Sequence, residues 1–177
     1  MSESPRSEQH AVAAVVVLAA GGGTRMKSSR SKLLHEVAGR TLLSYAVNAA
    51  QSVEPEHLVV VVGHQREQVL AHLDEIAPHV ETAVQDEQRG TGHAVQCGLA
   101  GLGELSGEIV VTYGDVPMLT GETLRHLVAQ HRERAEQVTV LTARVPDPTG
   151  YGRIVRDGDE IVRIVEHKDA SDDERGI

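Results

Sequence analysis

A glycine-rich segment with two nearby cations is the strongest chemical signal in this sequence. Residues 18–26 read Leu-Ala-Ala-Gly-Gly-Gly-Thr-Arg-Met, and Lys32 follows seven residues after Arg25. Glycines let a backbone approach a ligand closely, so that successive N–H groups can point at phosphate oxygens. Arg25 and Lys32 add two full positive charges. The segment therefore suits the phosphates of a nucleoside triphosphate, and the simpler alternative is a glycine turn beside two surface cations.

Two familiar phosphate-binding motifs do not fit this segment. The chain has no G-x-x-x-x-G-K-[ST] sequence, and Met26 stands where the last glycine of G-x-G-x-x-G would be. The segment is therefore predicted to be neither a Walker A loop nor a dinucleotide fingerprint.

An aspartate after an apolar run is the candidate metal ligand. Tyr113, Gly114 and Asp115 follow a run that reads as a strand, which places the carboxylate at the strand's end. Mg²⁺ takes oxygen ligands and commonly uses one or two carboxylates together with substrate phosphates. Asp115 is thus a candidate Mg²⁺ ligand. The alternative is that Gly114 and Asp115 only form a turn before Pro117.

The segment from Gln85 to Ala94 leads from a predicted strand into a predicted helix. Gly90 and Thr91 would lie at the helix N-terminus, where free N–H groups and a hydroxyl can hold a ligand. The Gln85 amide can pair with both a donor and an acceptor on the edge of a base. The alternative for Thr91 is a purely structural cap of the helix.

Two later segments carry weaker signals. Gly152, next to Tyr151, permits close approach to a sugar ring, and the carboxylate of Glu166 can accept hydrogen bonds from sugar hydroxyls. From the residues alone, the segment around Glu166 is also consistent with a solvated cluster of charges.

Apolar runs alternate with helical patterns along the whole chain, and this alternation indicates how these residues are positioned. Strands are expected at 11–20, 57–62, 81–85, 108–113 and 138–145, helices at 42–50, 67–73, 91–102 and 122–135, and a hairpin at 152–156 and 160–166. The expected fold is α/β, a mostly parallel sheet with helices on both faces and a late antiparallel hairpin. Ligands bind at the carboxyl ends of such strands, so one crevice can gather the candidate residues.

Composition limits the possible classes of protein. The 177 residues are 40% hydrophobic, which suits one domain at 11–177 behind a disordered polar tail at 1–10. A net charge of −9, no Lys/Arg run and 2% aromatic residues argue against nucleic acid as a partner. The first apolar run is shorter than the ~20 residues that span a bilayer, so no membrane association is expected. A single cysteine, Cys97, fits a reducing compartment, and the cytoplasm is the expected location.

Taken together, the motifs resemble the N-terminal uridylyltransferase domain of the bacterial bifunctional N-acetylglucosamine-1-phosphate uridylyltransferase/glucosamine-1-phosphate N-acetyltransferase family. The resemblance covers almost everything from Val12 to the end. The segments that carry it, in the family's order and approximate spacing, are 18–26, 32–35, 38–40, 90–94, 114–117, 150–154 and 164–170.

The resemblance implies a Rossmann-like nucleotidyltransferase fold and a reaction that joins UTP and N-acetylglucosamine 1-phosphate, with Mg²⁺, to give UDP-N-acetylglucosamine and pyrophosphate. Arg25, Lys32 and Asp115 are the expected catalytic residues, and Asp115 the metal ligand. Residues implied to contact the nucleotide or to border it and the sugar are Leu18, Ala19, Ala20, Gly21, Lys32, Gln85, Gly90, Thr91, Tyr113 and Gly114. Residues implied to hold the amino sugar are Gly152 and Glu166.

The chain departs from the family pattern in two ways. Ser31 stands where the family usually has proline before the lysine, which implies a less rigid loop. The sequence ends at Ile177, before the asparagines that in the family complete the sugar pocket and the Mg²⁺ site and before its acetyltransferase β-helix, so a fragment is expected. Family members form trimers through that β-helix, and this piece is therefore expected to be monomeric or weakly associated. Two different functions stay open: another sugar-1-phosphate nucleotidyltransferase and a non-catalytic module that binds nucleotide sugars.

Overall fold

The computed structural model describes residues 12–22, 26, 28–158 and 160–177. The expected tail at 1–10 and Arg25 lie outside the described residues. The chain divides into two compact units, Met1–Thr139 and Val140–Ile177, and each is considered by itself.

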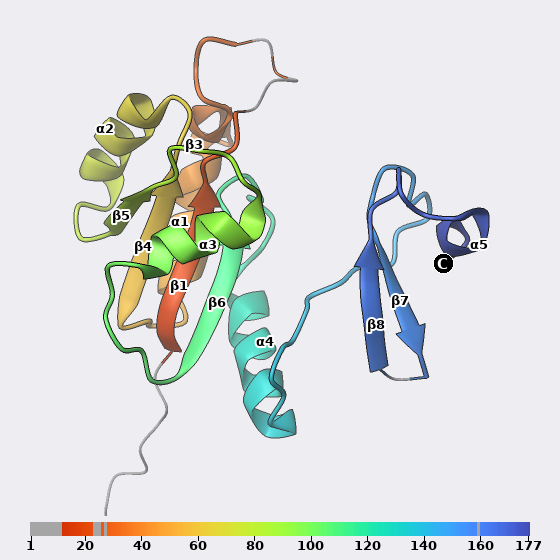
Figure 1. The fold of residues 1–177 in the computed structure, drawn as a ribbon. Helices are drawn as coiled ribbons and strands as arrows, with labels where there is room; N and C mark the ends of the chain where they lie inside the picture. The colour runs from red at the N-terminus through yellow and green to blue at the C-terminus, as the bar shows by residue number, and fades with distance from the viewer. Residues whose placement is uncertain (1–11, 23–25, 27, 159) are drawn as a thin grey trace, which may run out of the picture. The chain divides into compact units, whose positions relative to one another are not determined.

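A four-stranded parallel sheet forms the centre of the first unit (Figure 1). Its order is β5 (Glu81–Val84), β4 (His57–Val62), β1 (Val12–Ala19) and β6 (Glu108–Tyr113). All pairs are parallel, and Val17 of β1 lies between Val60 of β4 and Thr112 of β6. Every residue of β1 except Leu18 is buried, as its almost uninterrupted apolar sequence predicts for an internal parallel strand.

Helices cover both faces of this sheet, as predicted. Val15 and Val17 of β1 belong to a core cluster with residues from α1 (Leu42–Gln51), α2 (Arg66–Ile76) and α4 (Gly121–Arg134). Val16 points the other way and packs with Ala94 of α3 (Thr91–Leu99), which crosses the opposite face (Figure 1). The helix α3 ends three residues before the expected boundary at Leu102. Side chains alternate between the faces because a strand has a period of two residues.

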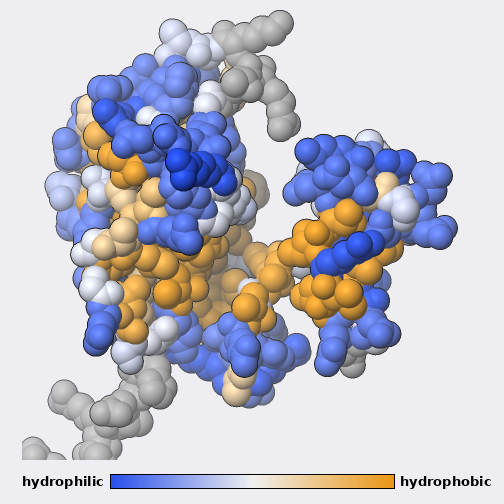
Figure 2. Space-filling model, viewed as in Figure 1, coloured by the Kyte–Doolittle hydropathy of each residue, from blue (hydrophilic) through white to orange (hydrophobic). Residues whose placement is uncertain are grey.

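Part of the α3 face of the sheet remains uncovered within the described residues. On β6, Val110 is buried, whereas Ile109 is 43% and Val111 is 42% exposed. The main contacts of α3 are with β1, β4 and β5, and these two side chains of β6 stay exposed. Figure 2 shows apolar surface on the visible faces of both units.

Short elements between β1 and α1 bring Lys32 to the sheet. A 3-10 helix, η2 (Lys32–Leu34), precedes the two-residue strands β2 (Glu36–Val37) and β3 (Arg40–Thr41), which pair antiparallel. The Thr41 hydroxyl accepts a hydrogen bond from the backbone N–H of Ser44 at 3.1 Å and thereby caps the N-terminus of α1. Leu33 is 1% exposed and belongs to the larger core cluster, which fixes η2 to the unit.

The second unit is an antiparallel hairpin followed by one helical turn. Strands β7 (Arg153–Asp157) and β8 (Glu160–Val165) pair antiparallel, which confirms the predicted late hairpin, and α5 (Asp172–Arg175) follows. The buried guanidinium of Arg153 donates to the Pro148 carbonyl at 2.8 Å and to the Arg175 carbonyl at 3.2 Å. These hydrogen bonds tie both ends of the hairpin unit together.

The strand expected at 138–145 is wrong, because the structure has no strand there. Val138 is 76% and Leu141 51% exposed. The run crosses the boundary between the two units and pairs with no other described segment. An apolar extended run becomes a strand only when a neighbour satisfies its backbone N–H and C=O groups.

None of the helices in the described part of the chain combines the length and the apolar character that a membrane span requires.

Candidate functional site

The carboxyl ends of β1, β5 and β6 and the start of α3 surround one groove, about 440 Å³ in volume. Its lining residues are Leu18, Ala19, Ala20, Gly21, Lys32, Gln85, Gln88, Gly90, Thr91, Ala94, Tyr113 and Asp115. All of them except Gln88 and Ala94 are among the residues expected from the sequence. Parallel strands end at the same edge of a sheet, which is why segments nearly a hundred residues apart meet here.

An ion pair joins the two charged residues of this groove. The Lys32 Nζ lies 2.6 Å from Asp115 Oδ2, with the side chains 25% and 35% exposed. Lys32 begins η2, whose Leu33 and Leu34 are buried, and Asp115 lies in the turn after β6. The ammonium and the carboxylate are therefore brought together at one point of the groove, where a phosphate and a cation could both be bound.

The carboxylate of Asp115 suits a hard divalent cation. No group of three or more His, Cys, Asp or Glu side chains that could hold a metal ion occurs in the described ranges. Mg²⁺ keeps several water ligands and often binds through one or two carboxylates plus substrate phosphates. The Asp115 carboxylate could thus supply one ligand to a metal ion that a phosphorylated ligand also binds.

The backbone after β1 is held from two sides. The Gly114 N–H donates to the Leu18 carbonyl at 2.9 Å, and the Gln88 side-chain amide donates to the Ala20 carbonyl at 2.9 Å. Gly114 is one of the expected site residues. It does not line the groove, and a Cβ there would lie 3.2 Å from the Leu33 side chain. Its observed contacts are thus with the backbone of β1 and the side chains beneath it.

Gly63, at the end of β4, also packs against this backbone. A Cβ at Gly63 would lie 2.9 Å from the Ala20 Cβ and 3.0 Å from the Ala20 carbonyl oxygen. A contact of 2.9 Å between two Cβ atoms requires displacement, and the Ala20 Cβ can move only together with its backbone. Only glycine therefore fits between β4 and the Ala20 backbone.

The turn between β5 and α3 is organised by Gln85, which is 4% exposed. Its Nε2 donates to the Gly90 carbonyl at 3.1 Å and lies 3.1 Å from His93 Nδ1. The amide nitrogen is thus engaged within the protein, and only the amide oxygen has no partner among the described residues. Both ends of this amide were expected to be able to pair with a base. In the structure only the oxygen is free to do so.

The N-cap of α3 is Gly90, with φ of +98°, and Thr91 is the first helical residue. No side chain makes a capping hydrogen bond at this helix end. The interpretation of Thr91 as a structural cap is therefore wrong, and its hydroxyl lies exposed beside the groove.

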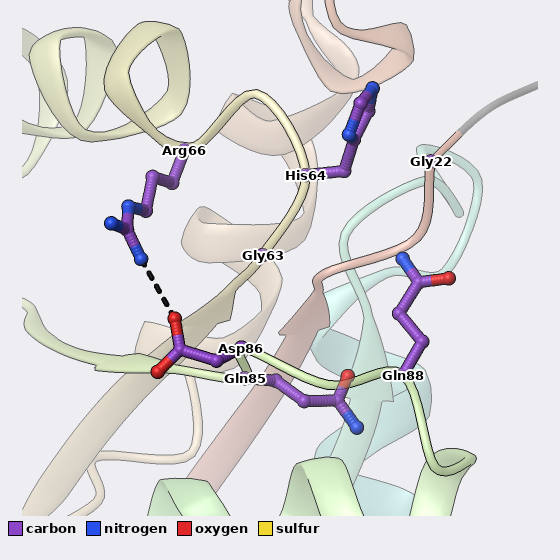
Figure 3. Close-up of a pocket in the computed structure, with 7 residues that line it drawn as sticks. All are labelled: Gly22, Gly63, His64, Arg66, Gln85, Asp86 and Gln88. Atoms are coloured by element: carbon purple, nitrogen blue, oxygen red, sulfur yellow. Dashed lines mark hydrogen bonds and ion pairs between the residues drawn. The ribbon is translucent and has the colours of Figure 1, made fainter.

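A second hollow of about 380 Å³ adjoins the groove (Figure 3). Its lining residues are Gly22, Gly63, His64, Arg66, Gln85, Asp86 and Gln88. Arg66 Nη1 lies 3.0 Å from Asp86 Oδ1, so the charges here are paired. Gln85 and Gln88 line both hollows and form the wall between them.

Gly152 and Glu166, the expected sugar-binding residues, both belong to the second unit. Arg153 pairs with Val165 across the hairpin, so Gly152 and Glu166 flank the same cross-strand pair. A Cβ at Gly152 would lie 3.4 Å from the Val165 carbonyl oxygen, and Glu166 is exposed. The hairpin register thus brings these two residues together at one end of the unit.

Gln88 and Ala94 are the groove residues that the sequence did not single out. Both lie within the segment 85–94, which the sequence did mark as ligand-binding. Their places depend on how the turn folds: Gln88 reaches back to Ala20, and Ala94 packs beneath α3 against Val16. The sequence contained one indication of the role of Gln88: it is a polar residue in the loop between Gln85 and Gly90, which were both predicted to bind the ligand.

The comparisons with known proteins agree with this geometry. Residues 15–167 match the family of MobA-like NTP transferase domains. A protein named Bifunctional protein GlmU from Cutibacterium acnes is 71% identical over 94% of this chain and 40% of its own length. Its namesake from Streptomyces avermitilis is 61% identical over 93% of this chain and 35% of its own length. The resemblance drawn from the motifs is thus confirmed, and the chain spans about two fifths or less of the length of these relatives.

Solved structures support the fold. A UDP-glucose pyrophosphorylase complexed with UDP-glucose has a TM-score of 0.62 at 20% identity, covering 88% of this chain and 69% of its own. Rv0371c from Mycobacterium tuberculosis, in a complex with manganese, has a TM-score of 0.55 at 23% identity, covering 67% and 58%. From its sequence match, its parallel sheet and the groove at the strand ends, this chain belongs to the family of MobA-like NTP transferase domains.

Proposed function

We propose that this chain carries the site that transfers uridylyl from UTP to N-acetyl-α-D-glucosamine 1-phosphate, giving UDP-N-acetylglucosamine and pyrophosphate for cell-envelope precursors. The observation that carries the proposal is the groove in which Lys32 and Asp115 meet the backbone after β1 and the turn before α3. The high identity to the GlmU relatives favours uridylyl transfer over the transfer of another nucleotide and over binding without catalysis. The cytoplasm remains the proposed location, and no nucleic acid or membrane partner is proposed.

The reaction replaces one bond at phosphorus. An oxygen of the sugar phosphate attacks the α-phosphorus of UTP, and the bond from that phosphorus to the pyrophosphate oxygen breaks. The attacking phosphate monoester is already ionised near neutral pH, so no general base is required. Catalysis then depends on positioning and on stabilising the negative charge that develops on the transferred and leaving groups.

The residues of the groove match these tasks. The backbone at 18–21 would lie along the nucleotide, the Lys32 ammonium would neutralise phosphate oxygens, and the turn at Gly90 and Thr91 would hold the uracil. Two further roles are proposed for residues that do not line the groove. Arg25, outside the described residues, would add a second cation for the phosphates, and Gly152 and Glu166 of the second unit would hold the amino sugar. Asp115 would hold Mg²⁺, which when bound neutralises charge on the phosphates. The manganese complex of a protein with the same fold supports a divalent cation.

A binding measurement and a turnover measurement test this proposal together. Calorimetry with UDP-N-acetylglucosamine and Mg²⁺ should show binding, and pyrophosphate release should be fastest with UTP among UTP, dTTP, CTP and GTP. Binding without pyrophosphate release would instead indicate a module that binds nucleotide sugars. A preference for another nucleotide or another sugar phosphate would indicate a different sugar-1-phosphate nucleotidyltransferase.

A further inference from the structure

A chain of hydrogen-bonding groups runs from the groove into α3. It starts at the Gly90 carbonyl, continues through the Gln85 amide nitrogen and the His93 ring, and ends at the Cys97 sulfur. Gln85 Nε2 lies 3.1 Å from both the Gly90 oxygen and His93 Nδ1, and His93 Nε2 lies 3.7 Å from Cys97 Sγ. The proposed function gives His93 and Cys97 no role.

The first group fixes the orientation of the Gln85 side chain. A backbone carbonyl only accepts hydrogen bonds, so the end of the amide that faces Gly90 must be the NH₂ group. The same NH₂ group carries a second hydrogen, and His93 Nδ1 lies within its reach. In the neutral ring Nδ1 must then be the acceptor and Nε2 must carry the proton, which points toward the Cys97 sulfur. The geometry thus selects one tautomer of His93 and one orientation of Gln85.

The opposite end of the amide is the oxygen. In Figure 3 the nitrogen of Gln85 points toward α3 and the oxygen points away from it. Gln85 is 4% exposed and lines the groove, and its oxygen has no partner among the described residues. The oxygen, and not the nitrogen, is therefore the end of this amide that is free to accept a hydrogen bond from a ligand.

We infer that His93 is a positioning residue for base selection, because it helps the Gly90 carbonyl to hold the Gln85 amide nitrogen and so leaves the oxygen as the end that is free for a ligand. This inference rests on the proposed function. The N3 of uracil carries a hydrogen, whereas the N3 of cytosine is an acceptor. A fixed oxygen can pair with the uracil N3–H, and an oxygen facing the cytosine N3 is repelled. With His93 in place, turning the amide breaks two hydrogen bonds of its nitrogen, to Gly90 and to His93. Without His93 only the bond to Gly90 opposes this turn, so the NH₂ group can face the base more often.

Substitutions at His93 separate this role from a merely structural one. In His93→Leu the ring is replaced by an apolar side chain of similar size, whereas in His93→Asn an amide oxygen can replace Nδ1 as acceptor. The measurement is the affinity for UTP and for CTP, each with Mg²⁺, by calorimetry. One hydrogen bond is worth about 1 kcal/mol, so His93→Leu should lower the UTP-to-CTP affinity ratio about fivefold. His93→Asn should restore most of the ratio, and His126→Ala, an exposed histidine on α4, should leave it unchanged.

The outcomes are distinguishable. If His93→Leu leaves the UTP-to-CTP affinity ratio unchanged, even where it weakens the binding of both nucleotides, the inference is overturned while the proposed function stands. If the unmodified chain does not prefer UTP, the proposed function and the inference both fail. The ¹⁵N NMR spectrum of the histidine rings tests the arrangement without any nucleotide: near neutral pH we expect the Nε2–H tautomer at His93, and an Nδ1–H ring would overturn the inference.

Discussion

The two units of the chain bring their proposed ligand-binding residues together in different ways. In the first unit, the groove collects segments that lie far apart in sequence, because three parallel strands end at one edge of a sheet. In the second unit, Gly152 and Glu166 are neighbours through a single antiparallel pair, Arg153 with Val165. The first arrangement depends on the packing of a whole core, and the second on the register of one hairpin. Changes to packing should therefore alter nucleotide binding, whereas changes at the hairpin should alter sugar binding only.

The largest effect is expected at the ion pair of the groove. Replacing either Lys32 or Asp115 with alanine should lower kcat by ~10²-fold or more, the typical cost of losing one preorganised electrostatic contact. Pyrophosphate release from UTP and the sugar phosphate measures this effect. The control is Lys168→Ala, because Lys168 is an exposed cation of the second unit. Normal turnover in the Lys32 or Asp115 variant would remove that residue from the proposed mechanism.

A substitution of Gly63 tests whether the groove depends on the close packing of β4 against Ala20. In Gly63→Ala the added Cβ would meet Ala20 at 2.9 Å, and overpacking of this kind typically costs ~1–3 kcal/mol of unfolding free energy. The displaced backbone of Ala20 should also weaken UTP binding. Urea unfolding and calorimetry measure the two effects.

The control for this change is Gly101→Ala, because a Cβ at Gly101 meets nothing within 4 Å. If Gly63→Ala proved as stable as Gly101→Ala and bound UTP normally, the close contact between β4 and the Ala20 backbone would not matter to the groove.

The local sequence was sufficient to predict a strand or a helix where the segment packs into the apolar core. The apolar run at 11–20 predicted a strand and the apolar spacing at 42–50 predicted a helix, because the spacing of apolar residues is a local property of the sequence. The run at 138–145 has the same valine-rich character, yet it forms no strand. A strand requires a partner, and no local pattern says whether one is present.

The same distinction applies to the groove. Its lysine, aspartate and glycines were predictable because their chemistry shows in the sequence. The role of Gln88 could not be predicted, since its hydrogen bond to Ala20 joins residues that are 68 positions apart in the sequence. The single orientation of Gln85 was also hidden, because it depends on Gly90 and His93 folding back toward it.

A substitution of Glu166 tests the proposed role of the second unit in binding the sugar. Replacing it with alanine removes a proposed hydrogen bond between a carboxylate and a sugar hydroxyl, a type typically worth ~1.5–3 kcal/mol. We expect the KM for the sugar phosphate to rise ~10-fold or more, while the affinity for UTP stays the same. Glu160→Ala, at the opposite end of β8, is the matched control. An equal loss of UTP affinity in Glu166→Ala would mean that the two units do not divide the ligand as proposed.

The smallest effect is expected at the end of β6 that lies away from the groove. The Arg132 guanidinium donates to both oxygens of Glu108 at 2.7 and 2.8 Å, and these hydrogen bonds hold the pKa of the Glu108 carboxyl below its usual value. A carboxyl whose native pKa lies below its unfolded pKa stabilises the fold at all pH values above the unfolded pKa, about 4.3. That contribution is lost as the pH falls through the native pKa. Because Arg132 is partly exposed, we expect ~1 kcal/mol or less.

Glu108→Gln should accordingly lower the free energy of unfolding at pH 7 and make little difference near pH 2, as measured by urea unfolding. Glu104→Gln, an exposed glutamate in the loop before β6, is the control for the change of charge. Affinity for UTP at pH 7 should be the same in both variants, since Glu108 begins β6 and Asp115 follows its other end. A Glu108→Gln variant that lost UTP affinity without losing stability would show that the groove depends on the far end of β6 as well as on the strand ends that line it.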